Sequence, residues 1–245
     1  MSPSIEKSHA SVQVTPKRSA PPQQPSQAAK PPVSRDRLTL SSQATQRESL
    51  ESLTRLKVQL ENPLPPAPSK PETSDWESLD RFCREALIQS LRQDEAVNAG
   101  LKSWNALPQD MRLLLGKRIS DIQAGIFGFQ PAPIRFEEGI YRGGFQPGTK
   151  PSIDIGPKAR VSANEFLNTV VHEQNHAFQW EKANKAMIKK LDPNDPYAAV
   201  AETWLDNFIE YTNPSKGVQA YRSQPIEVQS ASIGNQIAEA LLGKP

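Results

Sequence analysis

Two histidines four residues apart, with a glutamate beside the first, are the residues of this chain best suited to metal chemistry. On a helix, His172 and His176 fall one turn apart, so their side chains share one face. Two imidazoles on one face can bind one zinc ion at about 2.0–2.1 Å. Glu173 is rotated from His172 by about 100°, which directs it toward a water at the open position of the metal. The motif therefore predicts a zinc site at which Glu173 is the general base.

The residues around this motif predict the helix that carries it. Ser162, followed three residues later by Glu165 and then by an apolar run, forms a capping box that begins a helix at Ser162. Residues 152–155, which precede it, alternate in a way that predicts a short strand. The motif is therefore expected on a capped helix that directly follows a strand.

Residues 170–177 contain this motif and resemble the active-site helix of the zincin metallopeptidases. The resemblance covers about residues 150–242 and implies a zinc metalloendopeptidase that hydrolyses peptide bonds through a zinc-bound water activated by Glu173. In the zincins, an edge strand before the helix holds the substrate in an extended conformation. The residues in that place, which the resemblance implies are substrate-binding, are Ser152, Ile153, Asp154 and Ile155.

A catalytic zinc site needs a third protein ligand, and no histidine follows His176 in the sequence. An acidic residue must therefore take this role, and two are candidates. Glu227 lies in a helix that begins near Pro225, a residue suited to a first turn. Glu202 is the alternative third ligand: with Asp206 four residues later, it resembles the thermolysin-like arrangement of a ligand glutamate and an acid that orients a histidine.

The residues on either side of Glu227 favour it over Glu202 as the third metal ligand. Small residues share its helix face, which allows this helix to approach the histidine helix closely; they are Ala231, Gly234 and Ala238. A tyrosine and a proline before the glutamate are similar to the third-ligand segments of lethal-factor-like and several bacterial toxin metallopeptidases. That resemblance implies that Tyr221 stabilises the oxyanion.

The predicted fold class is α+β, a mainly helical zincin-like domain over residues 76–245 with a small antiparallel sheet and the active-site helix. Helices are predicted from about Ser74 and Pro108, and short strands between residues 134 and 155. Residues 1–75 form a leader rich in proline, serine and glutamine, with disorder over 1–43 and one amphipathic helix over 44–61. Cys83, on an apolar helix face, is expected in the core.

Composition and charge limit the classes of binding partner that we expect for this chain. The net charge of +2 excludes nucleic-acid binding driven by bulk charge, and no apolar run approaches the roughly 18 residues of a membrane span. We therefore expect a protein or peptide substrate, with residues 1–61 available to a secretion system or a regulatory partner. The first residues lack the plan of a signal peptide, which predicts a cytoplasmic protein or one exported by a signal-peptide-independent route.

The alternative to an enzyme is a catalytically silent zinc-binding interaction module, or a secreted effector or toxin scaffold that retains the fold without turnover. A purely structural zinc site has no need of the carboxylate at Glu173. Its presence favours the hydrolase.

Overall fold

The computed structural model describes residues 35–244, with side chains from Thr45 onward. The chain divides into two compact units, Met1–Ala44 and Thr45–Pro245, and the second holds the fold described below. The disorder predicted for residues 1–34 lies outside the described residues. The helix predicted over residues 44–61 corresponds to α1, which begins earlier than expected, at Arg35.

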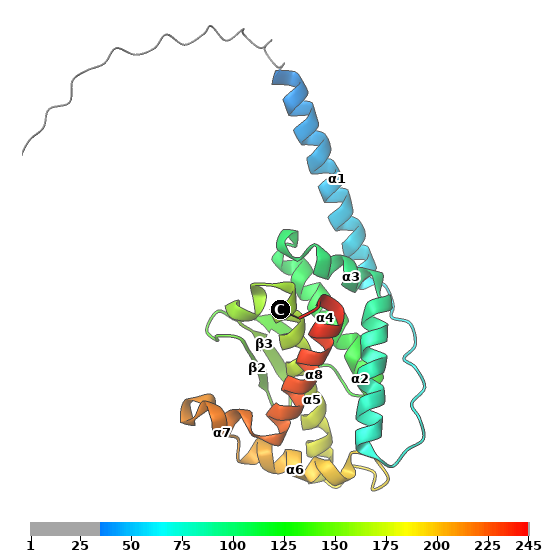
Figure 1. Cartoon of the computed structure of the whole chain (residues 1–245), viewed down its shortest axis with the longest axis vertical. Coiled ribbons are helices and arrows are strands. Elements are labelled where there is room, and N and C mark those ends of the chain that lie inside the picture. Colours follow the sequence, from blue (N-terminus) through cyan, green and yellow to red (C-terminus); the bar gives the residue numbers. More distant parts are fainter. Residues whose placement is uncertain (1–34, 245) are drawn as a thin grey trace, which may run out of the picture. The chain divides into compact units, whose positions relative to one another are not determined.

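The described residues form an α+β fold of eight helices, three short 3-10 turns and one three-stranded sheet (Figure 1). The helices are α1 (Arg35–Glu61), α2 (Trp76–Gln93), α3 (Glu95–Lys102), α4 (Gln109–Phe127), α5 (Ala163–Met187), α6 (Ala198–Ile209), α7 (Val218–Arg222) and α8 (Pro225–Leu242). The strands are β1 (Ile134–Phe136), β2 (Gly143–Gln146) and β3 (Ser152–Ile155), and the 3-10 turns are η1 (Trp104–Ala106), η2 (Pro157–Arg160) and η3 (Pro214–Lys216). The prediction of a mainly helical α+β fold is confirmed.

The helices begin and end where local chemistry favours it. The carboxylate of Asp75 accepts hydrogen bonds from two backbone amides of the first turn of α2, a capping arrangement that favours a helix start there. Gly128 ends α4 in the left-handed conformation, with φ 78°, which glycine adopts without steric cost. These local signals explain where α2 begins and where α4 ends. The short helix α3, which the sequence does not predict, lies between them in the chain.

The sheet is mixed, so the prediction of an antiparallel sheet is wrong. Its strand order is β1-β3-β2. β2 and β3 form an antiparallel hairpin in which Phe145 faces Ile153. β1 pairs with the other edge of β3 in parallel, with Ile134 opposite Ile153. Residues 137–142 therefore carry the chain from one edge of the sheet to the other, a crossing that strand periodicity alone does not reveal.

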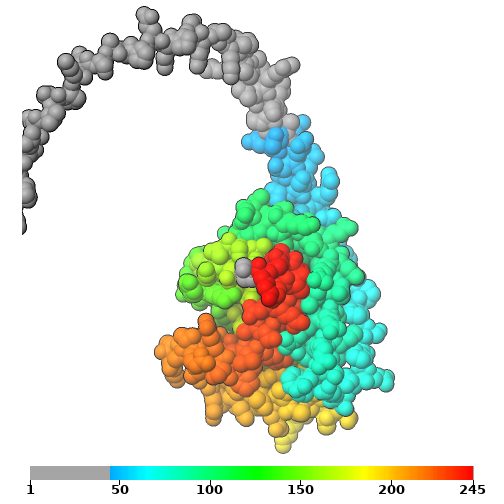
Figure 2. Space-filling model, in the orientation of Figure 1, coloured from blue at the N-terminus to red at the C-terminus, as the bar shows by residue number. Residues whose placement is uncertain are grey.

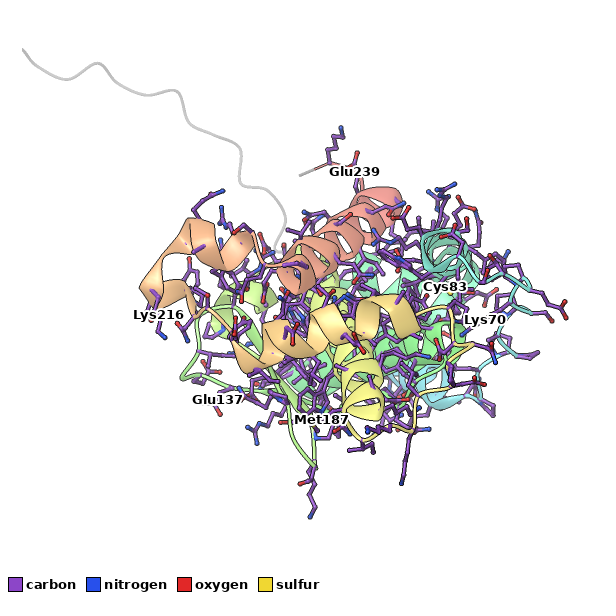
Figure 3. All side chains as sticks on the ribbon, turned by 90° about the horizontal axis from the view of Figure 1, so that it is seen from below. Lys70, Cys83, Glu137, Met187, Lys216 and Glu239 are labelled. Carbon is purple, nitrogen blue, oxygen red and sulfur yellow. The ribbon has the colours of Figure 1, made fainter. Side chains whose placement is uncertain are left out.

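α5 passes through the centre of the second unit and is packed on several sides. α8, α6, α4 and strand β2 all contact it, and α6 lies across it (Figure 3). Phe166 and Phe178 on α5 are fully buried, and the ring of Phe178 contacts those of Tyr197 and Trp204. These contacts fix the axis and rotation of the helix that carries the metal-ligand motif.

The proline-rich segment after α1 packs against the helices as an ordered strap, which we define as residues 62–73. Arg118 on α4 donates hydrogen bonds to the carbonyls of Leu60 and Asn62, and the Lys70 ammonium donates to the Phe127 carbonyl at 2.7 Å. Figure 3 shows Lys70 on the same side of the molecule as Cys83, which is fully buried on α2. A cavity of about 790 Å³ lies between the strap, α2 and α4.

Candidate metal centre

The metal-ligand motif lies in the middle of α5, whose start follows the predicted capping pattern. The Ser162 hydroxyl accepts a hydrogen bond from the Glu165 backbone amide at 3.1 Å. His172 and His176 then lie on one face of the helix, with 3.0 Å between their Nε2 atoms. The capped start and the four-residue spacing therefore bring the two imidazoles together as predicted.

Glu227, in the first turn of α8, completes the group. Its two carboxylate oxygens lie 3.4 Å from the Nε2 atoms of His172 and His176 respectively. Among the described residues, these three side chains form the group that could hold a metal ion, with ligand atoms all within 4.8 Å of one another. A tetrahedral ion with bonds of about 2.0–2.1 Å places its ligand atoms about 3.3–3.4 Å apart. The separations of 3.0–3.4 Å therefore suit a single metal ion.

A close approach of α8 to α5 makes this geometry accessible to a short carboxylate. A Cβ atom added at Gly234 would lie 2.8 Å from the Asn168 carbonyl oxygen and 3.4 Å from the His172 Cβ. A larger residue at this position would hold the two helices further apart. Gly234, one of the small residues predicted to share the Glu227 face, thus meets the histidine helix, whereas Ala231 of the same set is exposed.

The carboxylate and the two imidazoles strongly affect one another's protonation. Burial would raise the pKa of Glu227, but hydrogen bonds to His172 and His176 outweigh it and hold that pKa far below its usual range. Burial would lower the pKa of His176, yet the hydrogen bond to Glu227 and the charges of Glu173 and Glu227 raise it above 6.5. Both pKa shifts have one geometric cause, the contact of a single buried carboxylate with the Nε2 atoms of both imidazoles.

Glu173 is buried, with 7% of its surface exposed, and lies beneath strand β2. A Cβ added at Gly143 would come within 2.9 Å of the Glu173 Oε1 and 2.5 Å of the Thr169 Cγ2. Glycine at this point thus lets the strand lie directly on the helix beside Glu173. The charge of Glu173 acts on both His176 and Tyr221, so the predicted general base adjoins the metal-ligand group without belonging to it.

Two tyrosines face Glu227 from the segment that joins α6 to α8. Burial and a hydrogen bond to Glu227 raise the pKa of Tyr221, the predicted oxyanion-stabilising residue. Tyr211 was not predicted, although its hydroxyl donates to the Glu227 Oε1 at 2.7 Å. The two rings lie edge to face with centroids 6.1 Å apart. No periodic signal marks Tyr211, because it follows the end of α6 and meets Glu227 through a loop.

The alternative third ligand is not brought to the histidines. Glu202 and Asp206 lie on α6 and are exposed, whereas Ala201 and Trp204 on the same helix are buried. α6 therefore presents its apolar face to α5 and its acidic face to solvent. Neither residue is part of the metal-ligand group of the described chain.

The strand expected at the edge of the sheet lies in its centre. Ser152, Ile153, Asp154 and Ile155 form β3, which pairs with β2 on one side and β1 on the other. Ile153, Asp154 and Ile155 are also buried. The prediction of an edge strand here is wrong, because β1 and β2 pair with the two edges of β3. The edge strand nearest the metal-ligand group is β2.

None of the helices in the described part of the chain has the length and apolar character needed to cross a membrane. No protein-family model matches this chain, and no curated protein or solved structure matches it. The geometry of the metal-ligand group therefore carries the functional argument.

Proposed function

We propose that this protein is a zinc-dependent metallopeptidase with His172, His176 and Glu227 as metal ligands. The observation that supports it best is the convergence of the motif on α5 with a carboxylate from α8, at separations that suit one tetrahedral ion. Two nitrogens and one carboxylate are a ligand set used by catalytic zinc, which keeps a fourth position open.

Zinc, when bound, polarises a substrate carbonyl and lowers the pKa of a coordinated water toward about 7. Glu173 accepts a proton from the attacking water and passes it to the leaving amine, a role that its place beside His176 supports. Tyr221 donates a hydrogen bond to the oxygen on which charge develops. The raised pKa of Tyr221 keeps its hydroxyl protonated and able to donate.

The free edge of β2 is the place we assign to the substrate backbone. β2 pairs only with β3 among the described strands, so its other edge has unpaired amides and carbonyls. A peptide that adds to this edge as a further strand would gain main-chain hydrogen bonds. It would also pass beside Glu173, because Gly143 of β2 lies directly over that carboxylate. In Figure 2, the surfaces of the β2–β3 region and of α7 lie on the same side of α8.

The test compares the wild type with Glu173→Gln. Purified protein should retain about one zinc ion per chain in both forms, because Glu173 is not a ligand. A peptide library analysed by mass spectrometry should show cleavage by the wild type and at least a 100-fold loss in Glu173→Gln, the scale expected for a lost general base.

Two outcomes would count against the proposal. Equal cleavage by both forms would place the activity elsewhere. Zinc bound at His172, His176 and Glu227 without any cleavage would favour the catalytically silent zinc-binding module instead. Glu202→Ala is the matched control, since it removes an exposed glutamate of α6 that lies outside the metal-ligand group.

A further inference from the structure

A chain of buried side chains leads away from the metal-ligand group on the far side of the His176 ring. The Nδ1 atom of His176 lies 2.9 Å from the Gln179 Oε1. The Gln179 Nε2 donates to the Gln229 Oε1 at 2.8 Å, and the Gln229 Nε2 donates to the Asp80 Oδ1 at 3.2 Å. We call Asp80, Gln229 and Gln179 the amide relay. It joins α2, α8 and α5.

The orientation of the Gln179 amide is determined by its neighbours. Its nitrogen also faces the Ile226 backbone carbonyl at 3.3 Å, and a carbonyl can only accept a hydrogen bond. The oxygen of that amide must therefore face His176. An amide oxygen can only accept, so the His176 Nδ1 must carry a proton. The Ser230 hydroxyl lies 3.3 Å from both this oxygen and the His176 Nδ1; it accepts from the Asn175 amide at 2.9 Å and can donate to the Gln179 oxygen.

The other end of the relay is determined in the same way. Asp80 is buried, with 6% of its surface exposed, and pairs with Arg84 at 2.7 Å. Its carboxylate accepts from Gln229, which leaves the oxygen of that amide to face Gln179. All the donors in the relay point toward Asp80, from the imidazole through two amides to a buried acid.

We propose that Gln179, held by Gln229 and Asp80, is a positioning residue that fixes the His176 proton on Nδ1 and leaves Nε2 free for the metal. A ligand histidine in proteins is commonly held by a carboxylate or carbonyl that accepts from its other nitrogen. Here the carboxylate acts at a distance through two amides. The effect on metal binding rests on the proposed function, whereas the proton position on His176 can be measured in the protein without a metal.

The first experiment reads that proton position directly. The chain has only three histidines, so two-bond ¹H–¹⁵N correlation spectra of metal-free protein, recorded above the pH at which the rings titrate, can resolve each tautomer. We expect His176 to carry its proton on Nδ1 in the wild type. Gln179→Leu should shift it toward the other tautomer, and Gln179→Glu, which keeps an acceptor, should preserve it. A His176 with its proton on Nε2 in the wild type would overturn the proposal.

The second experiment measures zinc affinity by competition with a chelating dye. Gln179→Leu should weaken binding by about 10–100-fold, the usual effect of removing a partner of a ligand histidine. Asp80→Asn, which removes the charge but keeps an acceptor, should weaken it by a smaller factor. Unchanged affinity in both variants, with the tautomer unchanged, would refute the relay.

Gln174→Leu is the matched control for loss of folding. Gln174 is an equally buried glutamine of α5, and its amide bonds to the backbone of Ala132. Its replacement should lower stability without changing the His176 tautomer. If neither the wild type nor any variant binds zinc, the proposed function fails. The tautomer spectra still decide the role of Gln179 in that case.

Discussion

Replacing Gly143 by alanine tests the packing of β2 against the helix that carries Glu173. The added Cβ would lie 2.5 Å from the Thr169 Cγ2 and 2.9 Å from the Glu173 Oε1. Non-bonded carbon atoms in good contact are about 3.5–4.0 Å apart, so the strand must move outward by about 1 Å or both side chains must rotate. Overpacking of this kind costs about 1–3 kcal/mol of unfolding free energy.

Gly144→Ala is the control, because it adds the same atom one residue along the same strand. Its Cβ would meet only the Gln146 Nε2, at 3.8 Å. Urea denaturation should therefore give a free energy of unfolding lower by about 1–3 kcal/mol for Gly143→Ala and close to wild type for Gly144→Ala. Zinc content should stay unchanged in both, since the ligands come from α5 and α8.

The rate of peptide cleavage should also differ between Gly143→Ala and Gly144→Ala. A displacement of about 1 Å in a catalytic group can lower turnover by about 100-fold, so Gly143→Ala should lose most of its activity through Glu173. If the two variants are equally stable and equally active, β2 does not lie on Glu173 as described, and the reasoning fails.

Three further predictions follow from the site and the core. Zinc affinity, measured by calorimetry across pH, should fall as the pH drops, beginning above pH 6.5, because the pKa of His176 is raised and its Nε2 must lose a proton to bind metal. Gly234→Ala should destabilise the protein by about 1–3 kcal/mol and weaken zinc binding, whereas Gly125→Ala, with only one contact at 3.9 Å, should stabilise it by up to about 1 kcal/mol. Arg118→Ala leaves the carboxylate of its partner, Asp94, buried without a counter-charge. Urea denaturation should show a free energy of unfolding lower by about 3–5 kcal/mol.

The parts of the candidate site that depend on local spacing could be predicted from the sequence. A four-residue spacing on a helix brings His172 and His176 together whatever surrounds them. The choice of Glu227 rested on the small residues that follow it, because they determine how closely two helices can pack. Both arguments concern one helix face at a time.

The parts that depend on long-range contacts could not be predicted. The central position of β3 follows from β1 pairing beside it, and strand periodicity carries no information on strand order. Tyr211 reaches Glu227 through a loop, and Asp80 reaches Gln229 across 149 positions of the chain. The sequence does not predict that α1 begins as early as Arg35, because its first residues lack an apolar stripe.

The complete burial of Cys83 gives this protein an intrinsic probe of its own opening. It is the single cysteine of the sequence, its Sγ lies against the Ile126 carbonyl, and burial raises the pKa of the thiol to about 11. A thiol reagent can therefore react only after α2 separates from α4. The labelling rate in dilute denaturant reports the free energy of that separation, and repeating the measurement with zinc would show whether a metal bound at His172, His176 and Glu227 also stabilises the contact between α2 and α4.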